Sequence, residues 1–231
     1  MRRIMIAGTN SGCGKTTVTC AVLQALVNRK INVSSFKCGP DYIDPMFHKT
    51  VIGTAAYNLD TYLMSNDAVN YLLNKNSGDI AVIEGVMGFY DGFSFTEKGS
   101  THELSEITDT DVILVVNCRG MSLALVKGFK EFRKNNIKGV IFNNLSEKMY
   151  GNLAEKCRKI GLTPLGFLPN IKDVQISSRH LGLVTAGEID GIKDKMNLLA
   201  DYAEKYIDID KILEISENDR DTKFASPEIT K

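Results

Sequence analysis

A glycine-rich turn near the amino terminus carries the residues whose chemistry is easiest to identify. The segment 8–16 reads GTNSGCGKT and directly follows the apolar run 4–7. A turn of this kind between a strand and a helix points backbone N–H groups at phosphate oxygens, where the positive end of the helix dipole also lies. Lys15 would supply charge for the β- and γ-phosphates, and the Thr16 hydroxyl could bind Mg²⁺. We therefore expect a nucleotide site formed by Thr9, Asn10, Ser11, Gly12, Cys13, Gly14, Lys15, Thr16 and Thr17.

The turn departs from the usual phosphate-loop pattern G-x-x-x-x-G-K-[ST] at one position. That pattern would place its first glycine at position 9, whereas this chain has Thr9 there and a glycine at Gly8. The alternative is a glycine-rich turn that binds nothing. An apolar run before it and a helical pattern after it favour the phosphate loop.

Two further segments place acids directly after apolar runs. Residues 37–45 read KCGPDYIDP, with Asp41 and Asp44 among prolines and a glycine, and Glu84 follows the run 80–83. An acid at the end of a buried strand beside a phosphate loop is where P-loop enzymes keep a second Mg²⁺ contact. Asp91 lies further along, among glycines that could also mark a simple turn. For the 37–45 loop, a solvated Pro/Gly turn is the competing interpretation.

These residues need a scaffold, and the hydrophobic pattern supplies one. Apolar runs at 3–7, 33–36, 80–83, 112–116, 140–142 and 165–168 alternate with helical patterns at 15–29, 67–74, 123–134, 150–160 and 192–206. The alternation predicts an α/β fold of the P-loop NTPase type, doubly wound, with a mostly parallel sheet and helices on both faces. Ligands on such sheets gather at the carboxyl ends of the strands. We assign residues 1–207 to this domain and expect 208–231 to be a polar linker or tail.

The composition excludes several classes of protein. Lys plus Arg and Asp plus Glu both number 28, so no overall charge recruits nucleic acid or an anionic membrane. The five cysteines are never spaced C-x-x-C, which indicates reduced thiols rather than disulfides or a zinc site. No apolar stretch is long enough to span a membrane, and the chain enters a strand with no room for a signal peptide. We expect a cytoplasmic enzyme.

Five separated segments together resemble one family. These are 8–17, 37–45, 58–60, 84–92 and 178–184, and they look like the synthetase domain of the cobyrinic acid a,c-diamide synthases, in the dethiobiotin-synthetase-like branch of P-loop enzymes. The similarity covers about the first 210 residues. In that branch the loop has the form G-T-x-x-x-x-G-K-T, so the displaced glycine is a family trait. The resemblance implies an ATP- and Mg²⁺-dependent ligase that amidates the a and c acetate carboxylates of the corrin ring, on the route to cobalamin.

The resemblance also implies roles for individual residues. Lys15 would stabilise the transferring phosphoryl group, and Thr16, Asp41 and Glu84 are the Mg²⁺ candidates. Lys37 matches a lysine that faces phosphate and substrate in dethiobiotin synthetases, and it could otherwise be a solvated strand-end lysine. Tyr42, Ile43 and Asp91 match positions close to the corrinoid. Asn143 matches a residue that reads the adenine edge, with Asn144 as the alternative reader, and Pro169 would lie against the purine. His180 falls in a family motif whose chemical role the residues do not reveal.

The family normally continues into a glutaminase domain with a nucleophilic cysteine, and this chain ends before such a domain. We therefore expect it to use ammonia released elsewhere, and we expect a homodimer by analogy with relatives. A sister amidoligase on hydrogenobyrinic acid or nickel-sirohydrochlorin, or a cobyric acid synthase, remains an alternative. Segment 39–45 favours an a,c-diamide synthase over a cobyric acid synthase, and segments 38–45 and 178–184 do not suit dethiobiotin synthetase itself. A ParA/MinD-type ATPase switch is disfavoured, because the lysine that such proteins carry early in the loop is replaced by Asn10.

Overall fold

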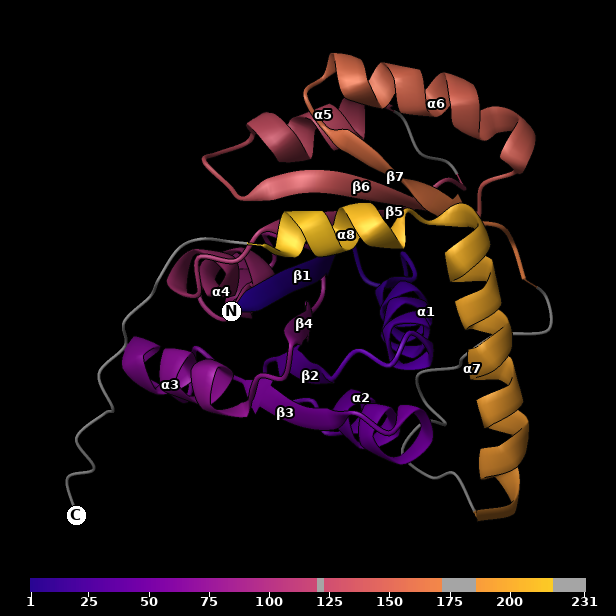
Figure 1. The fold of residues 1–231 in the computed structure, drawn as a ribbon. Helices are drawn as coiled ribbons and strands as arrows, with labels where there is room; N and C mark the ends of the chain where they lie inside the picture. Colours follow the sequence, from indigo (N-terminus) through magenta and orange to yellow (C-terminus); the bar gives the residue numbers. More distant parts are fainter. Residues whose placement is uncertain (120–122, 172–185, 218–231) are drawn as a thin grey trace, which may run out of the picture.

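The sheet has seven strands, and every neighbouring pair within it is parallel. The computed structural model describes residues 1–119, 123–171 and 186–217. The strand order is β3-β2-β4-β1-β5-β6-β7, so the first strand lies at the centre (Figure 1). The strands are β1 Arg2–Gly8, β2 Val33–Cys38, β3 Ala55–Leu59, β4 Ile80–Glu84, β5 Val112–Asn117, β6 Ile137–Asn143 and β7 Thr163–Leu168.

Helices cover both faces of this sheet. Alternate residues of β1 show the division, because Ile4 and Ile6 belong to one buried cluster while Met5 and Ala7 belong to the other. The first cluster receives side chains from α1 (Lys15–Asn28), α2 (Ile43–Phe47), the π-helical turn η1 (His48–Ile52), α7 (Ala186–Tyr206) and α8 (Ile209–Ser216). The second receives them from α3 (Asn66–Asn76), α4 (Thr101–Ile107), α5 (Leu123–Glu131) and α6 (Glu147–Lys159). The predicted doubly wound α/β fold is confirmed.

The polar segment predicted from residue 208 onward begins instead with a packed helix. Asp208 caps α8 by accepting a hydrogen bond from the Lys211 backbone N–H at 2.8 Å. Ile209 and Ile212 are buried in the first cluster, and α8 contacts β1. Figure 1 shows this helix lying close to β1. The folded domain therefore extends to residue 216, and the boundary expected at 207 is too early. Residues 218–231 lie outside the described part of the chain.

Strand β3 and helix α4 were also absent from the prediction. Strand β3 occupies the sheet edge, where most of its residues are only partly covered, so its sequence AAYNL lacks a continuous apolar run. Helix α4 begins at a serine cap, with Ser100 Oγ accepting from the Glu103 N–H at 3.0 Å. Within the described ranges, no helix is long and apolar enough to cross a membrane.

Candidate nucleotide and phosphoryl-transfer site

The predicted phosphate loop lies between the central strand β1 and helix α1. Gly12 and Gly14 adopt positive φ angles of 78° and 100°, a conformation that glycine adopts without the strain a side chain would cause. Gly8 is required for a different reason. A Cβ at that position would lie 2.4 Å from the Cys13 sulfur and 2.7 Å from Lys15 Cγ. The glycine displaced from position 9 to 8 thus makes room for the loop to fold back over the end of its own strand.

Lys15 lies folded beneath the loop in this structure. Its Nζ donates to the carbonyl oxygens of Asn10 at 3.3 Å and of Met87 at 2.5 Å. Burial lowers the pKa of Lys15 below its ordinary value. The ammonium is therefore held by neutral backbone oxygens, and a phosphate group would offer it a charged partner in their place.

Glu84 is the point where the elements of the site meet. Its side chain is fully buried at the end of β4, and its Oε1 accepts hydrogen bonds from Thr16 Oγ1 at 2.6 Å and from Lys37 Nζ at 3.0 Å. Thr16 stands on the first turn of α1, and Lys37 is near the end of β2. The structure thus brings together three of the predicted residues from three elements.

Lys37 is enclosed by acceptors rather than exposed at a strand end. Its Nζ contacts Asp44 Oδ2 at 2.6 Å, Glu84 Oε1 at 3.0 Å and the Gly85 carbonyl at 3.3 Å. Burial alone would lower the pKa of Lys37, but Glu84 and Asp44 raise it above its ordinary value. Lys37 is therefore a charged lysine whose three N–H bonds all have partners.

Asp44 is the second acid of this cluster, and sequence analysis did not select it. It lies on the short helix α2, 4% exposed, and burial together with Glu84 raises its pKa. Asp41, which was selected as a metal candidate, lies before that helix, and its Oδ1 accepts from the Ile43 N–H at 2.9 Å. The helical turn from 43 to 47 carries Asp44 inward, and a sequence pattern that gives no helix here could not distinguish the two acids.

A buried histidine beside Glu84 was also missed. His48 Nδ1 lies 2.7 Å from Ser35 Oγ, and its Nε2 lies 3.7 Å from Glu84 Oε2. Burial lowers the pKa of His48 to about 4, so the ring is neutral near pH 7. No spacing signal marked Ser35 or His48, because their meeting depends on the π-helical turn and on strand β2.

The residues expected near the second substrate are exposed. Tyr42 is 73% exposed and Ile43 is 39% exposed. Asp91 is exposed in the loop after β4, where its Oδ2 leaves no space for a Cβ at Gly88 (2.2 Å). The same hypothetical Cβ would lie 3.0 Å from the Thr9 carbonyl, which places Asp91 beside the phosphate loop.

Asn143, at the end of β6, braces the phosphate loop. Its Nδ2 donates to the Cys13 carbonyl at 3.0 Å, and a Cβ at Gly14 would lie only 1.9 Å from that nitrogen. Asn144 instead donates to Asn117 Oδ1 at 3.2 Å. Pro169 follows β7 and is half-buried. The adenine roles of Asn143 and Pro169 stay predictions, and the motif 178–184 with His180 lies outside the described residues.

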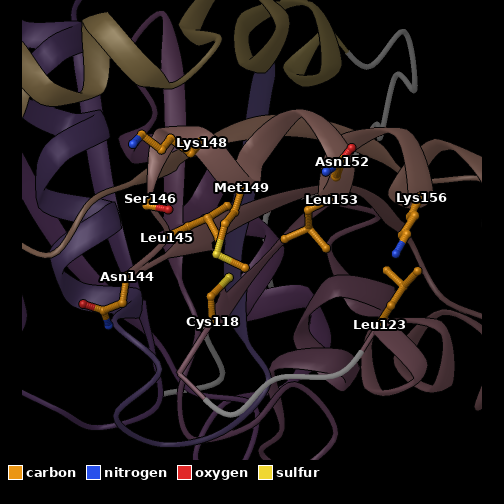
Figure 2. Close-up of a pocket in the computed structure, with 10 residues that line it drawn as sticks. All are labelled: Cys118, Leu123, Asn144, Leu145, Ser146, Lys148, Met149, Asn152, Leu153 and Lys156. Atoms are coloured by element: carbon orange, nitrogen blue, oxygen red, sulfur yellow. The ribbon is translucent and has the colours of Figure 1, made fainter.

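A cavity of about 650 Å³ opens next to Asn144. Figure 2 shows Cys118 and Leu123 facing a row of side chains from α6 and the loop before it. Leu145, Met149 and Leu153 give it an apolar wall, and Lys148 and Lys156 also line it. The cavity is lined by Cys118, Leu123, Asn144, Leu145, Ser146, Lys148, Met149, Asn152, Leu153 and Lys156.

Comparison with known proteins gives relatives that are longer than this chain. The chain is 42% identical over 96% of its length to the cobyrinate a,c-diamide synthase of Thermoplasma volcanium, of which it covers 51%. It is 41% identical over 93% of its length to the cobyrinate a,c-diamide synthase of Sulfolobus acidocaldarius, of which it covers 50%. The chain thus spans about half the length of these curated relatives.

Solved structures agree on the fold. The MinD cell division protein of Aquifex aeolicus superimposes with a TM-score of 0.55 at 16% identity, covering 94% of this chain and 95% of that one. The cell division protein FtsY of Thermotoga maritima superimposes with a TM-score of 0.54 at 15% identity, covering 80% of this chain and 69% of that one. At these identities the likeness concerns the fold alone. Residues 4–184, which include the phosphate loop and the acids after β2 and β4, match the family described as CobQ/CobB/MinD/ParA nucleotide binding domain, and the chain belongs to that family.

Proposed function

We propose that this chain is the ATP-dependent synthetase part of a cobyrinate a,c-diamide synthase, amidating the a and c acetate carboxylates of cobyrinic acid in cobalamin biosynthesis. The observation that carries the proposal is the Glu84 cluster beside the phosphate loop, in a chain about 40% identical to proteins of that name. A phosphate cradle adjoining a buried carboxylate–lysine group suits phosphoryl transfer.

The residues present fit ATP and Mg²⁺. The positive-φ glycines leave the loop backbone open to phosphate. In the part of the chain that the structure describes, the acceptors of Lys15 Nζ are backbone oxygens only. Among the described residues, Glu84 Oε2 has no hydrogen-bond partner although it is buried. Thr16, Glu84 and Asp44 would hold Mg²⁺, with Asp41 as the candidate from sequence. The ion would neutralise charge on the β- and γ-phosphate oxygens.

The proposed reaction proceeds in two displacements. A substrate carboxylate oxygen attacks the γ-phosphorus, the bond to the β–γ bridging oxygen breaks, and ADP leaves. Ammonia then attacks the carbonyl carbon of the acyl phosphate; inorganic phosphate leaves with the bonding pair and a proton is released to solvent. Lys15 stabilises the transferring group. Lys37 is occupied by Asp44, Glu84 and Gly85, so we assign it to holding the two carboxylates in place.

The substrate side of the proposal involves three exposed residues, Tyr42, Ile43 and Asp91. Exposed Tyr42 and Ile43 offer apolar surface to a macrocycle, and Asp91 beside the phosphate loop would orient the reacting carboxylate. Asn143 and Pro169 remain our candidates for the adenine. We further propose that ammonia comes from a glutaminase activity, that the protein is a homodimer, and that it works in the cytoplasm. The five free thiols suit a reducing compartment.

A direct assay tests the proposal. The purified chain is incubated with ATP, MgCl₂, an ammonium salt and cobyrinic acid, and the products are followed by ADP release and mass spectrometry. We expect cobyrinic acid to stimulate ADP formation and to be converted to mono- and diamide, and Lys15→Ala to abolish both. Parallel reactions contain hydrogenobyrinic acid or nickel-sirohydrochlorin in place of cobyrinic acid. Amidation of one of these alone would assign the chain to the sister amidoligases, and no stimulation by any of the three would refute the proposal.

A further inference from the structure

Two buried polar atoms face each other in the site without a hydrogen-bond partner. They are His48 Nε2 and Glu84 Oε2, which lie 3.7 Å apart on side chains that are both 0% exposed. Few of the described buried side-chain atoms lack a partner. Buried polar groups in native proteins are nearly always hydrogen-bonded, so an unpaired couple of this kind needs an explanation.

The imidazole of His48 is held rigidly in this orientation. Ser35 Oγ lies 2.7 Å from the opposite ring nitrogen, Nδ1, and is itself buried. The backbone carbonyl of His48 accepts from the N–H of Gly53 at 2.9 Å and of Thr54 at 3.3 Å, which closes the π-helical turn. Short π-helical segments are frequent at functional sites. Ring and backbone are thus both fixed, and the free nitrogen points at Glu84.

The contacts of the two ring nitrogens favour one tautomer of His48. A neutral imidazole has one N–H and one lone pair, whereas a carboxylate oxygen can only accept a hydrogen bond. A lone pair on Nε2 would face the Glu84 oxygen and be repelled by it, whereas an N–H would be attracted. The Ser35 hydroxyl can then donate to the lone pair on Nδ1.

We infer that His48 is a positioning residue for Glu84, with its Nε2–H directed at Oε2 and its tautomer set by Ser35. The other carboxylate oxygen, Oε1, is thereby presented to Thr16 and Lys37. At 3.7 Å the Nε2···Oε2 contact is electrostatic, and a shift of about 0.7 Å would make it a hydrogen bond. This inference rests on the proposed function to the extent that Glu84 is there to hold Mg²⁺ with ATP.

The first test reads the tautomer directly. The full chain is labelled with ¹⁵N-histidine, and long-range ¹H–¹⁵N spectra distinguish the two neutral forms; with three histidines in the sequence, single substitutions assign the signals. We expect His48 to carry its hydrogen on Nε2, and Ser35→Ala to shift the Nδ1 resonance. A wild-type His48 with its hydrogen on Nδ1 would overturn the inference.

The second test measures binding rather than turnover. Isothermal titration gives the ATP affinity with MgCl₂ and with EDTA for the wild type, His48→Leu, His48→Gln and Val51→Ala. Val51 is buried in the same π-helical turn, 6% exposed, and its truncation loosens the turn while leaving the imidazole in place. Loss of such a supporting hydrogen-bond donor costs about 10–100-fold in metal affinity. We expect the Mg²⁺-dependent gain in ATP affinity to fall about tenfold in His48→Leu and to be largely restored in His48→Gln, whose amide can donate.

The outcomes separate the two proposals. An unchanged Mg²⁺-dependent gain in His48→Leu, or an equal loss in Val51→Ala, would overturn the role of His48. A wild-type chain whose ATP affinity is indifferent to Mg²⁺ would instead contradict the proposed function, and the tautomer would then decide the inference about His48. Should His48→Leu fail to fold, the tautomer measured in the wild type still decides whether His48 directs its Nε2–H at Glu84.

Discussion

Replacing Lys37 by methionine should destabilise the protein strongly, because it leaves two buried acids without their counter-charge. The side chains of Lys37 and Asp44 are each 6% exposed and that of Glu84 is 0% exposed. Methionine retains most of the apolar stem, so the change removes mainly the ammonium. Breaking a buried ion pair by deleting one partner costs about 3–5 kcal/mol. For a domain of this size each kcal/mol corresponds to about 2–4 °C, so the melting temperature should fall by roughly 6–20 °C.

The loss should depend on pH in a defined direction. In the wild type the pKa of Lys37 is raised above its ordinary value of 10.5, so its contribution to stability is complete at neutral pH and is lost only as the pH rises above about 10. In the variant, Asp44 loses the lysine that opposes the effect of burial and of Glu84 on its pKa. An acid whose folded pKa is raised binds its proton more tightly when folded, so the variant loses stability as the pH rises above about 4. The deficit relative to wild type should therefore be larger at pH 8 than at pH 5.

Urea denaturation followed by far-UV circular dichroism at pH 8 and pH 5 measures the loss of unfolding free energy and its dependence on pH. Lys49→Met is the matched control, since Lys49 is exposed one residue after His48 and should change stability by less than about 0.5 kcal/mol. The double variant Lys37→Met/Asp44→Asn should recover part of the loss, because one unpaired charge is removed. A deficit below about 1 kcal/mol, or one equal at the two pH values, would refute this account of the cluster.

Three further predictions concern binding and catalysis. Glu84→Gln should lower kcat strongly and change the Mg²⁺ dependence of the reaction. Asp91→Asn should instead release monoamide or slow one amidation, with the KM for ATP nearly unchanged. Steady-state kinetics with product analysis measures both, and the reverse pattern would show that the two roles are interchanged. Gly14→Ala should weaken ATP binding at least about tenfold, because its Cβ would lie 1.9 Å from Asn143 Nδ2 at a φ of 100°; Gly151→Ala, which meets nothing within 4 Å, is the calorimetric control. The purified chain should support amidation with ammonia and release no glutamate from glutamine, and a coupled glutamate assay that detects release would contradict the assigned nitrogen source.

The central part of the fold could be predicted because its signals are local. Buried parallel strands read as continuous apolar runs, and six of the observed strands coincide with the runs identified in the sequence. Strand β3 has no such run, since the sheet edge demands less burial. Helix α8 follows α7 after two residues, Ile207 and the capping Asp208, and its apolar residues are spaced among charges. Its burial against β1 is a tertiary contact that cannot be predicted from a short, charged segment.

The residues of the site likewise fall into those that local sequence predicts and those that only the fold brings together. The phosphate loop and Glu84 are specified by sequence neighbours, and the structure joins them through Thr16 at 2.6 Å. The inward acid of the 37–45 loop depends on a helical turn that its two prolines obscure, which is why Asp41 was chosen and Asp44 was not. His48 and Ser35 come from a π-helical turn and a strand, and only the folded chain brings them together.

The carbonyl of Met87 and a phosphate group would compete for the same lysine, Lys15. The carbonyl of Met87 holds the ammonium at 2.5 Å, and Met87 itself has a φ of 46°, a backbone conformation that costs free energy in a residue other than glycine. A phosphate that binds Lys15 in place of Met87 would release this carbonyl, which belongs to the loop that continues to Asp91. A second ligand that binds better once this carbonyl is released would raise the affinity of the protein for the nucleotide. The nucleotide would raise the affinity for that ligand by the same factor. The contact between Lys15 and Met87 would thus couple the binding of the two substrates.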